Sequence, residues 1–326
     1  MAPRPASWRW LRRFWLGLLS LLAVGGTTLY ILGPMPHAAA LRVSVPAALP
    51  AAAAIPQVWS GHIKEPDSTL LEASAAFPLT FLPRIAADGR LPRLAYRRPT
   101  PPAGTRPRIA LVVVGFGLSA ADSRAAIDAL PSAVTLAFSA YTPDSEALAE
   151  SARARGHELL ASLPMESDGY PWNDAGPRSL LTGAPTATNR ENLEWAMGRL
   201  QGYVGLTGAS DGLRGEQFAA QASSFGLVLD ELARRGLLYV DPRPDATHPR
   251  IAGRSVDLVV DDPATRAEIE AKLLTLERTA REHGSALGLA GPLRPVTIER
   301  IVAWARDVEA RGFELVPVSA LVAKAK

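Results

Sequence analysis

The stretch from Arg108 to Ser119, RIALVVVGFGLS, constrains the fold of this chain more than any other. Its apolar run from Ala110 to Val114 is typical of a parallel strand that is buried on both faces. The sequence Gly115-Phe116-Gly117 predicts a tight turn, and Ser119 precedes an alanine-rich run that predicts a helix. In parallel α/β folds ligands bind at the carboxyl ends of the strands, so we expect a functional site to include this turn. The turn itself contains no acid, histidine or cysteine.

Strand-like and helix-like patterns alternate from residue 106 almost to the end of the sequence. The strand-like runs are Ile109 to Val114, Val134 to Phe138, Glu158 to Leu163, Tyr203 to Leu206, Leu237 to Val240, Val256 to Val260, Ala286 to Leu289 and Glu314 to Val316. The helix-like runs are Ala120 to Leu130, Ser145 to Arg155, Asn189 to Leu200, Gln217 to Arg235, Ala264 to His283 and Val296 to Arg311. Left-handed caps are expected at Gly156, Gly236, Gly284 and Gly312. The alternation predicts an α/β fold, and at this length a closed or nearly closed β/α barrel.

The first 32 residues have the pattern of a membrane anchor. Residues 1–13 contain four arginines and no acid, and residues 14–32 contain no charged side chain. An apolar stretch of this length nearly matches the ~20 residues needed to cross a bilayer, and the arginines predict that its amino-terminal side stays in the cytoplasm. We therefore expect a single-pass inner-membrane protein with its globular domain in the periplasm. Small residues at 38–40 leave open a cleaved signal peptide followed by secretion.

Residues 33–105 are rich in proline and alanine, a composition that favours an extended linker ahead of a globular domain at 106–326. One less biased block within it, residues 61–92, has the composition to dock on the globular domain or on a partner. The formal net charge of +3 is too small to indicate a nucleic-acid partner. The absence of cysteine excludes disulfides, thiolate metal sites and cysteine nucleophiles.

A colinear series of motifs resembles the divergent polysaccharide deacetylase family. The series consists of VTLAFSAYTP at 134–143, GHELLASLPMESDGYPWNDAG at 156–176, GYVG at 202–205, ELARRGLLYVDPR at 231–243 and FELVPVSAL at 313–321. Together with the first strand, the resemblance covers residues 107 to 322. It implies a NodB-like, irregular β/α barrel, preceded here by the expected transmembrane helix and linker.

The resemblance also implies an activity that the residues do not support. NodB-type enzymes hydrolyse an acetyl group with a divalent metal held by one aspartate and two histidines, a second aspartate as base and a further histidine as acid. The positions that match these residues are Val114, Gly115, Ser162, Ala209 and Gly291. None of them provides an equivalent ligand or proton carrier, so we expect a lost metal centre and no cofactor.

Several polar and aromatic residues follow the predicted strands and are expected at the mouth of the barrel. They are Glu166, Tyr170, Trp172, Asn173, Asp174, Asp241 and Arg243. Aromatic rings beside carboxylates and amides suit a sugar-binding groove. Two alternatives remain open: the loop at 166–174 uses its polar residues to hold its own turns, and Asp241 and Arg243 form a buried ion pair.

A cation site built only from carboxylates is a weaker alternative, with Asp241, Asp261 and Asp262 as its ligands. Asp262 precedes Pro263, which favours a helix cap at this position instead.

The sequence thus supports three hypotheses. The first is a membrane-anchored pseudoenzyme that binds an envelope glycan or a peptidoglycan fragment, or has a regulatory role. The second is an active hydrolase of an acylated glycan, with a site rebuilt on Asp241, Asp261 and Glu166. The third is a structural envelope scaffold. Protein partners are not indicated.

Overall fold

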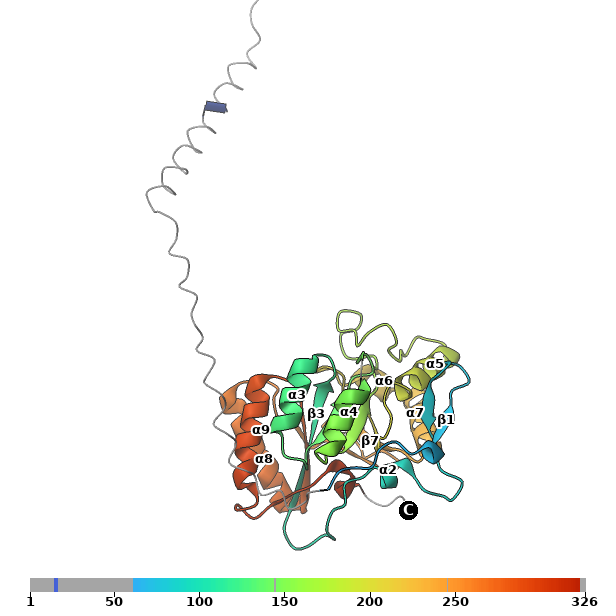
Figure 1. Ribbon diagram of the computed structural model, residues 1–326. Helices are drawn as coiled ribbons and strands as arrows, with labels where there is room; N and C mark the ends of the chain where they lie inside the picture. Colours follow the sequence, from blue (N-terminus) through green and yellow to red (C-terminus); the bar gives the residue numbers. More distant parts are fainter. Residues whose placement is uncertain (1–14, 17–60, 144, 245, 323–326) are drawn as a thin grey trace, which may run out of the picture. The chain divides into compact units, whose positions relative to one another are not determined.

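The computed structural model describes Trp15, Leu16 and residues 61–143, 145–244 and 246–322 (Figure 1). These later residues belong to a compact unit that spans Ala54–Lys326. Apart from Trp15 and Leu16, the expected basic segment and membrane anchor lie outside the described residues, as does the linker up to residue 60. In the part of the chain that is described, no helix combines the length and the apolarity that crossing a membrane requires.

A nine-stranded parallel sheet forms the centre of the compact unit. Its strands are β3 (Arg108–Phe116), β4 (Thr135–Phe138), β5 (Leu159–Ser162), β6 (Gly205–Thr207), β7 (Leu238–Asp241), β8 (Gly253–Ser255), β9 (Leu258–Val259), β10 (Ser285–Ala290) and β11 (Glu314–Leu315). Hydrogen bonds join them in the order β8-β7-β6-β5-β4-β3-β10-β9, and β11 pairs with the start of β3. The predicted α/β fold with a parallel sheet is confirmed.

Helices connect the strands and pack along the outside of the sheet (Figure 1). They are α3 (Ala120–Ala129), α4 (Ser145–Ala154), α5 (Thr186–Met197), α6 (Glu216–Ala220), α7 (Ala222–Arg234), α8 (Arg266–His283) and α9 (Pro295–Val308). The single helix predicted for 217–235 is two helices, because the backbone of Gln221 is extended. The four glycines predicted as left-handed caps all have positive φ.

Alternate residues of each strand face two different apolar layers. In β3, Ile109, Leu111 and Val113 pack against the helices, while Ala110 and Val112 point into a second cluster on the inner face of the sheet. Every residue of β3 after Arg108 is buried. A parallel strand with helices on one side and an apolar interior on the other has to be apolar along its whole length, as the sequence predicts.

One short segment, residues 253–259, pairs with both ends of the sheet. Its first half, β8, pairs with β7, and its second half, β9, pairs with β10. Between them Val256 N donates to Asp241 O over 2.9 Å and Asp257 N donates to Leu287 O over 2.8 Å. Of the strand predicted for Val256 to Val260, only Leu258–Val259 is a strand, and the preceding β8 was not predicted, because the segment changes its pairing partner midway.

Residues 61–98 of the expected linker pack onto the barrel, whereas residues 101–105 are exposed. They contain η1 (Ser68–Leu70), the antiparallel strands β1 (Leu71–Ala73) and β2 (Phe81–Pro83), and α2 (Pro92–Ala95). Leu70 and Tyr96 are buried. Glu72 pairs with Arg235 of the α7 end over 2.8 Å. The apolar residues in the less biased block explain why this part of the chain docks and why it belongs to the compact unit.

Two adjacent buried residues, His157 and Glu158, lie where β5 begins, at the end of the barrel opposite its mouth. The Glu158 carboxylate accepts hydrogen bonds from Arg98 N (2.8 Å), from Ser319 N (3.2 Å) and from the Ser319 hydroxyl. His157 Nδ1 lies 2.8 Å from Val134 O. Glu158 therefore fixes the carboxyl-terminal segment, including η2 (Val318–Leu321), across this end of the barrel.

Burial shifts the pKa values of these two residues in opposite directions. It raises the pKa of Glu158 from 4.5 to about 7 and lowers the pKa of His157 from 6.5 to about 4. Glu158 contributes stability that is fully present below pH 4.5 and lost as the pH rises through about 7. His157 contributes stability that is fully present above pH 6.5 and lost as the pH falls through about 4. Between pH 4.5 and 6.5 the contributions of Glu158 and His157 to the free energy of unfolding change with pH in opposite directions.

We predict that Glu158→Gln removes one slope and leaves the other. The free energy of unfolding of this variant should fall, relative to wild type, as the pH drops from about 7 towards 4.5, with a limiting slope of about 1.4 kcal/mol per pH unit. His157→Gln should show the opposite trend. Urea unfolding between about pH 4 and 8 measures both. If the free energy of unfolding depended on pH in both variants as it does in wild type, the shifted pKa values assigned to Glu158 and His157 would be wrong, whatever the absolute stabilities.

Candidate functional site

The carboxyl end of β3 contains a bulge instead of the turn expected from the sequence. Val114 pairs with Ala137 of β4 and Phe116 pairs with Phe138, so Gly115 is an extra residue between two matched positions. The backbone φ of Gly115 is 96°, a conformation that glycine adopts without strain and other residues adopt only with strain. The strand therefore runs two residues further than predicted, and Val114, at 2% exposed, stays inside the barrel.

The loop that follows β10 lies directly on this end of β3. A Cβ added to Gly291 would be 2.4 Å from Val114 Cγ2 and 2.7 Å from Val114 O, and φ at Gly291 is 136°. A Cβ on Gly115 would be 3.3 Å from Leu293 N. Val114, Gly115 and Gly291 therefore lie together in one closely packed region. The family resemblance expects an aspartate or a histidine at each of these three positions. The space for longer side chains is filled.

The remaining two positions are also enclosed. Ser162 ends β5 beside Thr207 of β6, and both Ser162 and Ala209 are buried. The Ser162 hydroxyl has no hydrogen-bond partner among the described residues. Its buried place in the strand matches the role of a small polar core residue.

Asp261 holds the loop after β10 in place. Its carboxylate accepts hydrogen bonds from Gly291 N (3.0 Å) and from the Thr297 hydroxyl (3.0 Å). Burial raises its pKa. The predicted helix cap at Asp262 is wrong, because α8 begins at Arg266 and Thr265 is the residue whose side chain caps it.

Asp241, at the end of β7, forms the ion pair that the sequence left open. Arg243 donates through Nε to Oδ1 over 2.9 Å and through Nη2 to Oδ2 over 2.7 Å, which is a bidentate pair. The Asp241 side chain is buried, and the Arg243 guanidinium also lies over the Phe225 ring. Both carboxylate oxygens are thus engaged, and the pair acts as a structural link at the strand end.

The structure does not assemble the cation site considered from the sequence. Within the described ranges, no group of three histidine, aspartate or glutamate side chains is placed to hold a metal ion. Asp241 is paired with Arg243, Asp261 accepts from Gly291 and Thr297, and Asp262 is exposed and lies 3.4 Å from Arg214. The proposal of Asp241, Asp261 and Asp262 as joint ligands is therefore wrong, because each carboxylate has a separate partner.

The loop after β5 uses most of its polar residues for its own conformation. Glu166 is buried and accepts hydrogen bonds from Thr182 N (2.5 Å) and the Thr182 hydroxyl (2.7 Å). Asn173 donates to Asp168 O over 3.0 Å, and Asp174 Oδ1 accepts from Gly176 N over 2.9 Å. The structural role is shown for Glu166 and Asn173, and Glu166 is removed from the candidate site; Asp174 bonds to the loop through Oδ1 only.

A small pocket opens at the carboxyl ends of the strands. Its volume is about 140 Å³, and it is lined by Leu118, Ser139, Tyr141, Asp174, Ala175, Ser210, Asp211 and Leu213. The lining comes from the loops that follow four neighbouring strands, β3 to β6. Asp174 is the only residue of the predicted set that lines this pocket. The others were missed because the sequence showed that loops follow these strands without showing which side chains turn inward.

Two aromatic residues of the same loop are exposed. Trp172 is 93% exposed and Tyr170 is 39% exposed, and neither lines the pocket. An almost fully exposed tryptophan is unusual, because its large apolar surface favours burial. Trp172 therefore offers a contact surface on the loop that also contributes Asp174.

A model described as divergent polysaccharide deacetylase matches residues 111–322. The chain belongs to the divergent polysaccharide deacetylase family. An uncharacterized protein of Haemophilus influenzae is 24% identical over 212 residues, which cover 62% of this chain and 72% of that protein.

Two solved structures were also compared with this divergent polysaccharide deacetylase. The crystal structure of an uncharacterized protein from Agrobacterium tumefaciens C58 matches with a TM-score of 0.70 and 36% identity, over 75% of this chain and all of that one. The catalytic domain of a peptidoglycan N-acetylglucosamine deacetylase from Eubacterium rectale matches with a TM-score of 0.41 and 14% identity, over 68% of this chain and 91% of that one. The second likeness is too low to support an argument.

The metal that NodB-type deacetylases use does not fit the residues of this divergent polysaccharide deacetylase. Val114, Gly115, Ala209 and Gly291 have no side-chain donor atoms, and Ser162 is a lone enclosed hydroxyl. Structural or catalytic metal sites need several oxygen or nitrogen ligands that converge on one point. We therefore derive no step through a metal at these positions.

We predict that Gly291→Ala destabilises the protein more than Gly312→Ala. Both glycines have positive φ, but a Cβ at Gly312 meets open space whereas one at Gly291 meets Val114. The shared backbone strain costs about 1 kcal/mol, and overpacking adds about 1–3 kcal/mol at Gly291 only. Urea unfolding of both variants measures the difference. Equal losses of stability would show that the loop after β10 is not tightly packed on β3.

Proposed function

We propose that this protein is a membrane-anchored, periplasm-facing member of its family that binds an envelope glycan, with a recognition or regulatory role in place of metal-dependent deacetylation. The observation that carries the proposal is the direct packing of Gly291 on Val114, which fills the space between two of the expected catalytic positions. The anchor and the periplasmic location rest on the arginines and the uncharged stretch in the first 32 residues.

The pocket at the strand ends has the chemistry to hold a sugar ring. Asp174 and Asp211 line it with the hydroxyls of Ser139 and Ser210, and none of its lining residues is basic. Carboxylates accept hydrogen bonds from sugar hydroxyls, and serine hydroxyls both donate and accept. One carboxylate oxygen of Asp174 already accepts from Gly176 N, which fixes the orientation of the group. The charge of the lining favours an uncharged or cationic glycan.

Trp172 supplies the apolar part of the proposed contact. Small-molecule sites combine a few placed polar groups with aromatic surface, and Trp172 belongs to the loop that carries Asp174 into the pocket. A glycan longer than one ring extends from the pocket over this exposed indole. A peptidoglycan fragment has hydroxyl-rich rings and sufficient length, and its uncharged N-acetylglucosamine ring is the part that suits the acidic lining.

A hydrolase rebuilt on other carboxylates is not supported. Glu166 is bonded to Thr182, Asp241 to Arg243, and Asp261 to Gly291 and Thr297. A pair of carboxylates in acid–base catalysis has to flank a common scissile bond of the substrate. These three groups instead hold three different parts of the backbone.

We predict that Trp172→Ala weakens glycan binding by about tenfold, because it removes the exposed aromatic surface beside the pocket. Asp174→Asn should weaken binding to a similar extent through loss of a charged acceptor. Leu274→Ala is the matched control, since Leu274 is also a large apolar residue, 60% exposed, on α8. Calorimetric titration of the full-length chain with peptidoglycan fragments and chitooligosaccharides measures the affinities. A wild-type chain that binds none of these glycans would favour the scaffold hypothesis instead.

We also predict that the full-length chain binds zinc, manganese or calcium with no defined stoichiometry at the strand ends. The Asp241→Asn and Asp261→Asn variants should titrate like wild type, because neither carboxylate is free to take a cation. Calorimetry on the three proteins gives the comparison. Stoichiometric binding that either substitution abolishes would overturn the pseudoenzyme proposal and justify assays with acetylated sugars.

A further inference from the structure

The pocket at the strand ends contains two carboxylates that have no cationic partner among the described residues. They belong to Asp174 and Asp211. No hydrogen bond or ion pair from the described part of the chain engages the Asp211 carboxylate, and Asp174 accepts hydrogen bonds through Oδ1 only. The arginine that follows each aspartate in the sequence pairs with a different carboxylate, Arg178 with Glu191 over 2.8 Å and Arg214 with Glu216 over 3.1 Å. The negative charge of the pocket is thus open to a cation.

The turn after β6 holds the backbone of Asp211 in one conformation. Ser210 N donates to Leu213 O over 2.8 Å, and Leu213 N donates to Ser210 O over 2.9 Å. Between them Asp211 and Gly212 have φ of 47° and 87°, the pair of positive angles that a two-residue turn of this kind requires. A backbone that is ordered before the ligand arrives costs less to bind with, so this turn favours a contact at Asp211.

The hydroxyl of Ser210 is a second and independent indication of a polar ligand. Ser210 lines the pocket and is 7% exposed. Its backbone N and O are both bonded to Leu213, and its hydroxyl has no hydrogen bond to any of the described residues. Side-chain hydroxyls buried to this extent normally have a partner. A ligand with hydroxyl or amino groups supplies the missing one.

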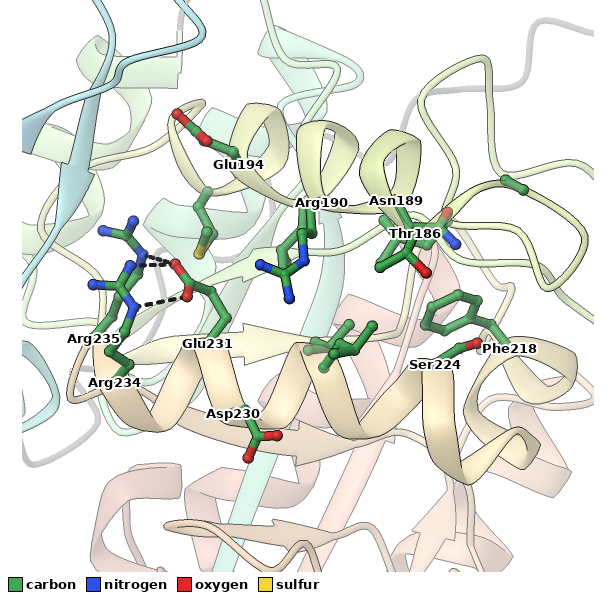
Figure 2. Close-up of a pocket in the computed structure, with 16 residues that line it drawn as sticks. Thr186, Asn189, Arg190, Glu194, Phe218, Ser224, Asp230, Glu231, Arg234 and Arg235 are labelled. Carbon is green, nitrogen blue, oxygen red and sulfur yellow. Dashed lines mark hydrogen bonds and ion pairs between the residues drawn. The ribbon is translucent and has the colours of Figure 1, made fainter.

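The acids of the larger groove between α5 and α7 differ from this pair, because each of them is bonded. The groove occupies about 470 Å³, and most of its apolar side chains are buried (Figure 2). Glu231 contacts Arg234 and Arg235 over 2.6 Å, as the dashed lines in Figure 2 show. The other two acids of its lining are also engaged, Asp230 with Arg250 over 2.5 Å and Glu194 with the Ser74 hydroxyl over 2.5 Å. The uncompensated charge at the strand ends is therefore not shared by this groove.

We propose that the pocket at the strand ends binds a hexosamine ring with a free amino group, whose ammonium lies against the carboxylates of Asp174 and Asp211. The inference rests on the glycan binding proposed above and selects the cationic ring from the two kinds that the acidic lining favours. A hydrogen bond between an ammonium and a carboxylate is about twice as strong as one between neutral groups. An N-acetyl group has no charge to offer and needs more room in a pocket of about 140 Å³.

The chemistry of this ligand also implies a preceding reaction. A free amino group forms on such a ring when water hydrolyses the acetamide of an N-acetylhexosamine and releases acetate. The residues at the strand ends do not support a metal-dependent hydrolysis of this kind in the present chain. An amide hydrolysis by another protein therefore has to supply the ligand.

Tetrasaccharides of glucosamine and of N-acetylglucosamine test the proposal, because they share their rings and linkages and differ in charge. Calorimetric titration of the full-length chain at about pH 6, where the amino groups are protonated, gives both affinities. We expect the glucosamine tetrasaccharide to bind about tenfold more tightly.

Asp211→Asn should lower the affinity for the glucosamine tetrasaccharide by about fivefold and leave the affinity for the acetylated one nearly unchanged. Asparagine tolerates the left-handed backbone as aspartate does, so the substitution keeps the turn and removes the charge. Asp168→Asn is the matched control, since Asp168 is an exposed aspartate of the loop after β5 that does not line the pocket. It should bind both compounds like wild type.

The outcomes separate this inference from the function on which it rests. Equal affinities, or tighter binding of the acetylated tetrasaccharide, would overturn the free amino group and leave glycan binding in place. If neither tetrasaccharide binds, glycan binding fails and the inference fails with it. An Asp211→Asn variant that binds the glucosamine tetrasaccharide as wild type does, or an equal loss in Asp168→Asn, would also overturn the inference.

Discussion

The burial of β3 on both of its faces is the constraint on which the rest of this structure depends. The strand pairs with β4 on one side and β10 on the other, and β11 joins it at its start. Helices cover one face and the apolar interior covers the other, so a charged side chain anywhere after Arg108 would lose its hydration. In this chain the apolar requirement extends to Val114, and the loop after β10 closes over the position where a catalytic acid would otherwise reach solvent.

Much of the fold could be predicted from the sequence because its signals are local. The apolar run before Gly115 identified β3, and the glycines after the helices identified their ends. The pairing change at 253–259 could not be predicted, because it depends on contacts with β7 and β10, which lie far apart in the sequence. The composition of residues 61–92 indicated that this block could dock on the globular domain or on a partner, but its strands could not be predicted, since they are three residues long and show no periodicity of their own.

The candidate site could also be predicted only in part from the sequence. The family resemblance predicted the loss of ligands at Val114 and Gly291, and the pairing of Asp241 with Arg243 was one of two alternatives. What the sequence lacked was direction: it placed Glu166 in the correct loop but did not show that the carboxylate turns towards Thr182.

The segment at 253–259 also affects how this protein meets other copies of itself. A parallel sheet that ends in an uncovered strand presents a row of unpaired backbone groups to any neighbouring chain, and such edges promote aggregation. Here the two ends of the pairing order belong to one continuous segment, and the Arg254 side chain donates to Ser285 of β10 over 2.7 Å where the backbone has left it. At this seam the sheet offers a second molecule no long run of free backbone, which limits edge-to-edge association between copies of the chain.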